Sequence, residues 1–259
     1  MFNIETYLDS LREDIKKINV SYKDIKYLPD LSRFKKLKYL NCSHNKLTFL
    51  PLLNENLKEL NCNNNQLTSL PELNENLKEL NCNNNQLTSL PNLNGKLNGI
   101  YCSNNQLTSL PQLNEKLKHL CCSHNKLTFL PHLNENLKGL YCSNNQLTSL
   151  LLNEKLKHLY CNNNQLTSLH LNEKLELFDY RINPIYEIIG YNNKHIINQK
   201  MQILNKFRYS YYCLKFKKQF RDWLWVRIRE PKIRKRYSHN YLIEHLHEDT
   251  DLDEVLNNW

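Results

Sequence analysis

Residues 57–71 run Leu-Lys-Glu-Leu-Asn-Cys-Asn-Asn-Asn-Gln-Leu-Thr-Ser-Leu-Pro, and residues 77–91 repeat that stretch without a change. Recognisable copies extend from about residue 15 to residue 189, with a period of about 20 residues. Such a period is typical of solenoids, in which each unit buries its apolar face by stacking on its neighbours. After a looser first copy at Ile15, the copies begin at Leu37, Leu57, Leu77, Leu97, Leu117, Leu137, Leu156 and Leu175.

Each copy contains a short alternation of apolar and polar residues that predicts a β-strand. In the copy at 57, Leu60 and Cys62 flank Asn61, so both would face inward while Asn61 faces out. Stacking would then place the strands in parallel, roughly 4.8 Å apart. The spacing of Leu, Cys and Asn within the copy resembles the leucine-rich repeat pattern.

One asparagine recurs in every copy, and its recurrence favours a structural role over a ligand site, which would be local. We expect its amide to bond to backbone groups of its own coil and of the next coil, because a buried backbone group without a partner is costly. The series comprises Asn45, Asn65, Asn85, Asn105, Asn125, Asn145, Asn164 and Asn183.

The rest of each copy is too short for an α-helix. Most copies contain Leu-Pro, and proline fixes φ at about −65° and favours extended chain before it. We therefore predict a convex side that is extended or holds one 3₁₀ turn, followed by a polar Asn-Glu turn.

The start of the chain and its composition bear on the compartment. No stretch approaches about 18 apolar residues, so no spanning helix is predicted. Residues 1–14 carry early acids and lack the apolar segment of a signal peptide. They instead predict a short amphipathic helix (Ile4, Tyr7, Leu8, Leu11) that covers the open end of the stack. We expect an intracellular protein.

Seven of the nine cysteines hold the same inward position, where a free thiol behaves as a small hydrophobe. One thiol per coil, an odd total and no secretion signal favour reduced cysteines over a disulfide framework. His119 and Cys121 share a face, but a zinc site needs three or four ligands. We therefore predict no metal and no cofactor. The inward thiols are Cys42, Cys62, Cys82, Cys102, Cys122, Cys142 and Cys161.

Residues flanking the inward leucine should form the concave face of the stack. Its first half is rich in amides and slightly acidic, whereas its second half carries Tyr and His. Tyrosine gives a large contact area at low entropic cost. A solvated face decorated by duplication alone is the alternative. The predicted partner-binding residues are Tyr39, Glu59, Glu79, Tyr101, His119, Tyr141, His158 and Tyr160.

The period stops after Ile189, and the chain becomes basic. Residues 200–236 hold thirteen Lys/Arg and two acids, a net charge of +11 in 37 residues, while the last 23 residues hold six acids and no Lys or Arg. Apolar residues three or four apart predict a helix that begins near Ile197 and ends at Pro231. Its basic patch comprises Lys215, Lys217, Lys218, Arg221, Arg227, Arg229, Lys232, Arg234, Lys235 and Arg236.

Three roles for this tail stay open. It could cap the last coil with its apolar stripe buried, lie on an anionic membrane surface, or bind nucleic acid phosphates. Two further short helices are expected, around Tyr241–Leu246 and after Thr250. The acidic end could also fold back on the basic helix, which would weaken both binding roles.

The repeat L-x-x-L-x-C-x-x-N-x-L-T-x-L-P resembles the short bacterial-type leucine-rich repeats. The whole layout resembles the leucine-rich repeat proteins of giant amoeba-infecting viruses, which are mimivirus-like, and the segment Phe216–Ser238 is similar to a tail shared among them. Some bacterial effectors with similar repeats carry a cysteine-dependent ubiquitin ligase domain. Cys213 lies among cations that could lower its pKa, but that domain is several times longer than this tail.

Together these observations predict an α+β repeat protein with three parts: an N-terminal helical cap (1–14), a leucine-rich repeat array of about nine repeats (15–189) and a basic helical module (190–259). We expect a non-catalytic scaffold that binds an unidentified protein partner, without a small-molecule substrate. If the viral resemblance holds, it would act in the host cytoplasm. The alternatives are an adaptor recruited to nucleic acid or anionic membrane by its tail, and a thiol-dependent ligase.

Overall fold

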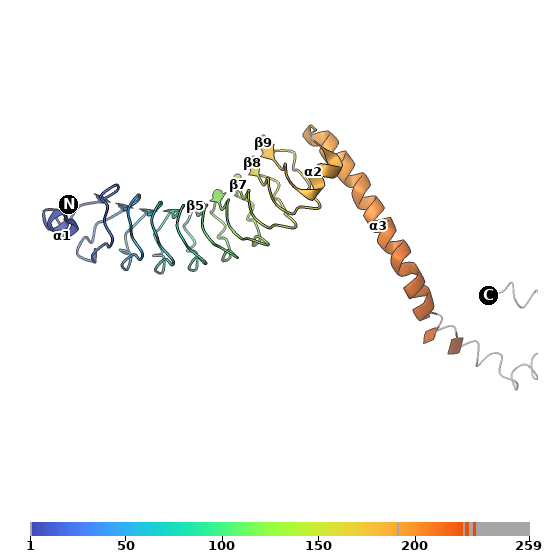
Figure 1. Ribbon diagram of the computed structural model, residues 1–259, viewed down its shortest axis with the longest axis horizontal. Helices are drawn as coiled ribbons and strands as arrows, with labels where there is room; N and C mark the ends of the chain where they lie inside the picture. The colour runs from blue at the N-terminus through green and yellow to red at the C-terminus, as the bar shows by residue number, and fades with distance from the viewer. Residues whose placement is uncertain (1, 191, 225, 228–229, 232–259) are drawn as a thin grey trace, which may run out of the picture. The chain divides into compact units, whose positions relative to one another are not determined.

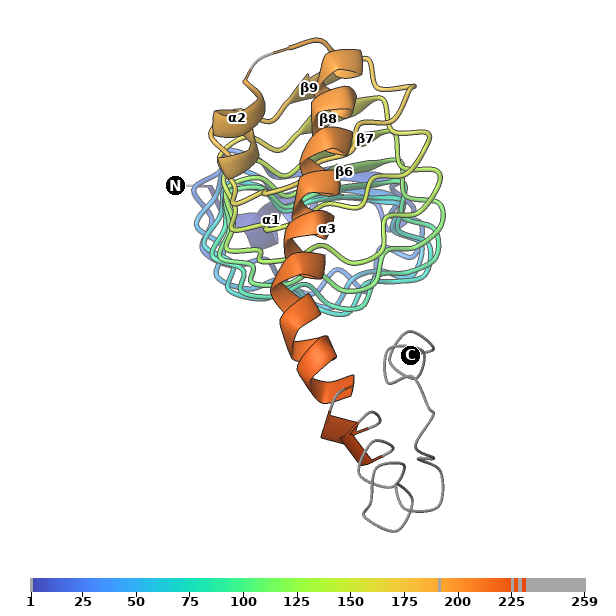
Figure 2. The same cartoon turned by 90° about the vertical axis from the view of Figure 1, so that its right-hand side faces the viewer.

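The computed structural model describes residues 2–190, 192–224, 226–227 and 230–231. In this part of the chain, strands of three residues form one parallel sheet whose order follows the sequence (Figure 1). Viewed along the stack, the coils lie behind one another with their strands on one side (Figure 2). The strands are β1 (Lys17–Asn19), β2 (Tyr39–Asn41), β3 (Glu59–Asn61), β4 (Glu79–Asn81), β5 (Gly99–Tyr101), β6 (His119–Cys121), β7 (Gly139–Tyr141), β8 (His158–Tyr160) and β9 (Leu177–Asp179).

The core is the inside of the coil, as the alternation predicts. Leu60 pairs in register with Leu40 and Leu80 on the neighbouring strands. Leu60 is 2% exposed and Cys62 is fully buried. Glu59, which precedes Leu60 in the strand, points away from the core and is exposed. Each coil therefore adds one layer of leucine and cysteine to a continuous apolar column.

The asparagine series forms the predicted ladder, but its direction differs from the expectation. The Oδ1 atom of Asn125 accepts a hydrogen bond from Leu107 N at 2.9 Å, and its Nδ2 donates to the carbonyls of Cys102 and Cys122 at 3.0 and 3.1 Å. The amide thus joins its own coil to the preceding coil, not to the next one. The reason is that backbone N–H groups of this turn already donate forward, as Asn125 N does to Asn144 O.

A left-handed residue precedes each ladder asparagine and makes the sharp turn possible. From His44 to Asn163 this residue is Asn or His, with φ between 52° and 56°, and these types tolerate that region. The last coil departs from the pattern because Ile182 holds φ 54° with a β-branched side chain that is 65% exposed.

The convex side contains bends and turns and no α-helix between β1 and β9, as predicted. Its Asn-Glu turn, however, holds a second ladder that we did not predict. Asn94 Nδ2 donates to Asn74 O at 2.7 Å and to Leu77 O at 3.2 Å. The next members each donate to the one before: Asn114, Asn134, Asn153 and Asn172.

At the N-terminal end, α1 (Ile4–Asp9) lies against the first coil. The side chain of Asn3 caps the helix by accepting from the backbone of Glu5 and Thr6. Ile4 and Leu8 of the predicted apolar stripe are buried, while Tyr7 and Leu11 are half-buried.

At the other end, the coil pattern passes into helices. In the last coil Tyr180 replaces the inward cysteine and donates from its hydroxyl to Gly190 O at 2.5 Å. The helix α2 (Pro184–Ile189) follows the last ladder asparagine, Asn183. We did not predict α2, although proline at a first helical position is a known start signal.

The first two turns of α3 (Lys194–Leu224) complete the last coil with side chains in place of a further coil. The amide of Asn198 accepts from Leu171 N at 3.1 Å and donates to Leu171 O at 2.7 Å. The ammonium group of Lys194 donates to the carbonyls of Glu173 and Leu175. These bonds satisfy backbone groups that the next coil would otherwise pair.

The described chain divides into two units after Met201. Ile197 and Met201 are buried in the first unit, but Phe207 and Tyr211 are 70% and 61% exposed. The capping role, one of the three left open for the tail, is therefore supported at the first two turns of α3, which belong to the unit that holds the coils. α3 is described to Leu224, and the described residues 226–227 and 230–231 are also helical, up to the predicted stop at Pro231. The two shorter helices expected after Tyr237 lie outside the described residues.

None of the helices in the described ranges is long and apolar enough to cross a membrane.

Candidate functional site

The concave face consists of the first and third residue of each strand, since the middle residue is buried in β1 to β8 and half-buried in β9. The structure places all eight predicted partner-binding residues on this face. The first positions are Lys17, Tyr39, Glu59, Glu79, Gly99, His119, Gly139, His158 and Leu177, and the third positions are Asn19, Asn41, Asn61, Asn81, Tyr101, Cys121, Tyr141, Tyr160 and Asp179.

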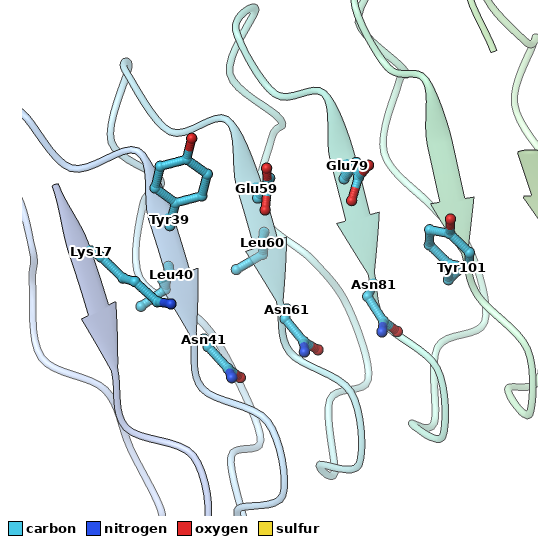
Figure 3. Close-up of a pocket in the computed structure, with 10 residues that line it drawn as sticks. All are labelled: Lys17, Tyr39, Leu40, Asn41, Glu59, Leu60, Asn61, Glu79, Asn81 and Tyr101. Atoms are coloured by element: carbon cyan, nitrogen blue, oxygen red, sulfur yellow. The ribbon is translucent and has the colours of Figure 1, made fainter. Parts of the chain in front are cut away.

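The first half of this face is hollowed between β1 and β5, with a volume of about 350 Å³. We call this space the acidic hollow. Glu59 and Glu79 stand side by side near its centre, between Tyr39 and Tyr101 (Figure 3). Lys17 lines its N-terminal end. Its floor is made by Leu40, Leu60, Asn41, Asn61 and Asn81.

A glycine determines where the Tyr101 ring lies. A Cβ atom at Gly99 would be 3.1 Å from Cε2 of Tyr101, so the ring folds back over the glycine of its own strand. Partial burial raises the pKa of Tyr101, and the nearby Glu79 carboxylate raises that pKa further. The phenol therefore stays protonated and neutral at physiological pH, where its O–H can donate to a ligand.

The second half of the face carries an aromatic pair instead. The rings of Tyr141 and Tyr160 are stacked, with centroids 5.2 Å apart and planes at 8°. Gly139 makes room for this arrangement, because a Cβ there would be 3.0 Å from His119 Nδ1 and 3.1 Å from Tyr141 Cε2. Burial raises the pKa of Tyr141, with smaller contributions from Cys121 and Tyr160.

His158, another of the predicted residues on this face, lies in a small charged group. Lys157 Nζ and Glu176 Oε1 are 2.6 Å apart, and His158 Nε2 is 3.7 Å from Glu176 Oε2. The hydrogen bond from Lys157 is the main reason that the pKa of Glu176 lies below its usual value. Such exposed pairs are worth little to stability.

The eight cysteines that the structure describes are all free, and seven of them form the predicted inward column. Burial raises the pKa of Cys42 and of Cys142 to about 12, and it also raises the pKa values of the other thiols in the column. Partial burial raises the pKa of Cys121, on the concave face, to about 11. A reactive cysteine needs the opposite shift. Within the described ranges, no three potential metal ligands come together.

Two exposed phenylalanines lie away from the concave face and were not singled out in the sequence. Phe49 and Phe129 replace the serine found at this position in most of the other coils, and they are 55% and 58% exposed. They stand four coils apart at the turn before the convex side. The signal for them was their departure from an otherwise constant repeat.

The predicted tail patch is only partly described. Lys217 and Arg227 are exposed. For Lys215, Lys218 and Arg221 the structure describes the helix α3 but not the side chains. The remaining members lie outside the described residues: Arg229, Lys232, Arg234, Lys235 and Arg236.

The similarity of this chain to known protein families lies in its repeats. A family model described as "Leucine Rich repeats (2 copies)" matches residues 55–95, and one described as "Leucine Rich Repeat" matches residues 36–54. None of the curated proteins matches the chain.

Solved structures match the array more extensively. YopM from Yersinia enterocolitica WA-314 shares 34% identity over 70% of this chain and 40% of its own, with a TM-score of 0.65. YopM from Yersinia pestis, described as a leucine-rich effector protein, shares 36% over 67% of this chain and 51% of its own, with a TM-score of 0.64. The functional domain of InlJ from Listeria monocytogenes is described as including a cysteine ladder. It shares 26% identity over 70% of this chain and 46% of its own, with a TM-score of 0.51.

The chain thus spans about half or less of these proteins' lengths. The match to InlJ agrees with the column of inward thiols seen here. Family models, solved structures and coil geometry agree, and this chain is a leucine-rich repeat protein.

Proposed function

We propose that this chain is a non-catalytic scaffold that binds a protein partner through the concave face. The observation that carries the proposal is the contrast between constant and variable positions. The inward positions hold Leu, Cys and Asn in nearly every coil, whereas the concave positions change from Glu to Gly, His or Tyr. A face needed only for stacking has no reason to differ from coil to coil.

The chemistry of the concave face also suits protein recognition. It combines tyrosine rings held in place by neighbouring glycines with amides and carboxylates. Rigid tyrosines lose little entropy on binding and combine an apolar ring with a polar end, which is why they are enriched in interfaces. The leucine-rich repeat fold is typical of protein interaction scaffolds, and the bacterial effectors noted above have it.

The non-catalytic part of the proposal is supported by the state of the thiols. Each cysteine with a described side chain has a raised pKa, so it is mostly protonated at neutral pH and a poor nucleophile. Cys213, the predicted candidate for a ligase, has no described side chain. Transfer of ubiquitin from an activated thioester to Cys213 would contradict the proposal.

The test is affinity capture from cell lysate with the full chain and two double variants. Y141A/Y160A removes the stacked pair from the concave face, while F49A/F129A removes two exposed aromatic rings elsewhere. We expect the first variant to lose its partner and the second to keep it, with both folded by circular dichroism. Equal capture by all three proteins would contradict binding through the aromatic part of this face.

The tail supports a second candidate, an adaptor that binds nucleic acid or anionic lipid. Its support is the net charge of +11 over residues 200–236. Against a membrane-surface helix, the exposed apolar side chains do not form one stripe, because Ile203 and Phe207 share one side of α3 while Tyr209 lies on another. Binding of RNA or lipid vesicles that is strong at about 50 mM salt and lost at about 300 mM would support this candidate.

A further inference from the structure

We infer that the acidic hollow binds an arginine or lysine side chain of an extended segment of the partner protein. This rests on the proposed function of the concave face and adds the chemistry of what it recognises. Glu59 and Glu79 are in register on β3 and β4, so their carboxylates are neighbours on the surface (Figure 3).

The two carboxylates are not neutralised within the described chain. No ion pair of the described residues involves Glu59 or Glu79, although Lys58 and Lys78 precede them in sequence. Like charges side by side on neighbouring strands are unfavourable. A cation placed between them would remove this repulsion, which gives the hollow an electrostatic preference for a basic group.

The spacing fits a guanidinium group. Neighbouring strands are roughly 4.8 Å apart, so one arginine with five N–H donors can bond to both carboxylates at once. Hydrogen bonds between guanidinium and carboxylate are about twice as strong as neutral ones. Lysine can also bridge the pair, but as a point charge without the fork geometry.

The tyrosines and the floor indicate the rest of the segment. Tyr39 on β2 and Tyr101 on β5 stand at either side of the pair, three strand steps or roughly 14 Å apart. An extended chain covers this length with about four residues. Ring faces attract a cation or its alkyl stem, and the floor amides of Asn61 and Asn81 can bond to a backbone.

The charge along the hollow gives the segment a direction. Lys17 lies at the β1 end, about two strand steps from Glu59, and its ammonium group points toward Asn41 (Figure 3). A basic residue over the glutamate pair would therefore be followed, toward β1, by an acidic or carbonyl group near Lys17.

The second half of the concave face lacks this chemistry. Its corresponding positions hold Gly139 and His158 in place of the two glutamates, and its carboxylates Glu176 and Asp179 are already paired with Lys157 and Arg181. The preference for a basic side chain is thus expected at β3 and β4 and not along the whole face.

The experiment pans a phage-displayed library of random heptapeptides on the full chain and measures the affinity of the selected peptides. E59Q/E79Q removes the pair and keeps its shape. E115Q/E135Q is the matched control, because it removes two exposed glutamates from neighbouring coils outside the hollow.

We expect selected peptides with a basic residue at a fixed position. Their affinity should fall about tenfold or more with E59Q/E79Q and less than about twofold with the control, since a charge-assisted hydrogen bond is worth a factor of this size. Selected peptides without a basic residue, an equal loss in both variants, or no peptide that depends on Glu59 and Glu79 would overturn the inference.

Failure here is distinguishable from failure of the proposed function. If the captured protein partner is lost with Y141A/Y160A but kept with E59Q/E79Q, the concave face binds and the hollow does not recognise a cation. If neither variant affects capture, the concave face itself is the wrong surface.

Discussion

The inside of the coils and their concave surface are made by the same strands, yet they follow opposite rules. Along the inside, the same leucine, cysteine and asparagine return at each step, and nearly all are buried. On the concave surface, neighbouring strands present Glu79, Gly99 and His119 in succession. The inside is where stacking energy comes from, whereas the surface is free to differ without loss of the fold.

This difference shows that the positions that repeat for packing and the positions that vary for recognition are next to each other in the sequence. Cys122 lies in the apolar column, and Cys121 immediately before it lies on the concave face. Because side chains in a strand alternate between faces, adjacent residues can serve stability and binding independently. Substitutions at the two kinds of position should therefore have effects of very different size.

The largest effect is expected at the asparagine ladder. Asn125→Ala removes four hydrogen bonds and leaves the backbone N–H of Leu107 buried without its acceptor. We expect a loss of about 3 kcal/mol in the free energy of unfolding, measured by urea denaturation. Asn92→Ala, at an exposed convex position, should change it by less than about 0.5 kcal/mol. Equal effects would mean that the ladder is not a stabilising element.

The next effect tests the two adjacent cysteines against each other. Cys122→Ser places a hydroxyl group in an apolar column that has no hydrogen-bond partner arranged for it. This should destabilise the protein by about 2 kcal/mol. Cys121→Ser, on the half-exposed concave side, should be close to neutral. Thermal unfolding followed by circular dichroism distinguishes the two. A stable Cys122→Ser protein would show that the column tolerates a polar group.

A smaller effect is expected at the C-terminal end of the stack. Asn198→Ala removes the paired hydrogen bonds to the backbone of Leu171 and should cost about 1–2 kcal/mol. Hydrogen exchange should show the loss locally, as faster exchange of the Leu171 amide with little change in the coils around β4. Gln202→Ala, exposed and beyond the first unit, is the control. Unchanged exchange at Leu171 would contradict this role for Asn198.

The smallest effect on stability is expected at the concave surface. The double variant Y141A/Y160A loses one stacked aromatic pair, which is worth about 1 kcal/mol. Calorimetry should therefore show only a small decrease in Tm, although we expect binding of the partner to be lost. A decrease as large as that of Asn125→Ala would mean that the tyrosines are part of the core rather than a recognition surface.

Much of the fold could be predicted from local patterns. The strands, the inward leucines and thiols, and the extended convex side all follow from a period of two within a period of about 20. The second asparagine ladder was missed because Asn-Glu is also an ordinary turn sequence, and only the contacts of Asn94 and Asn114 with the preceding coil show its role. The boundary between the two units after Met201 was not predicted, because a helical period does not reveal where a packing partner ends.

The sequence by itself determined which face of each strand is buried and which residues reach the concave surface, because alternation along an extended chain is a local property. Only the tertiary structure decided how those residues group. The ring of Tyr141 stacks on that of Tyr160, and Glu59 comes beside Glu79, only once the coils are stacked in register. The direction of the asparagine bonds and the bonds of Asn198 to Leu171 likewise depend on what the neighbouring coil offers. These are contacts between residues about 20 positions apart, which local sequence does not contain.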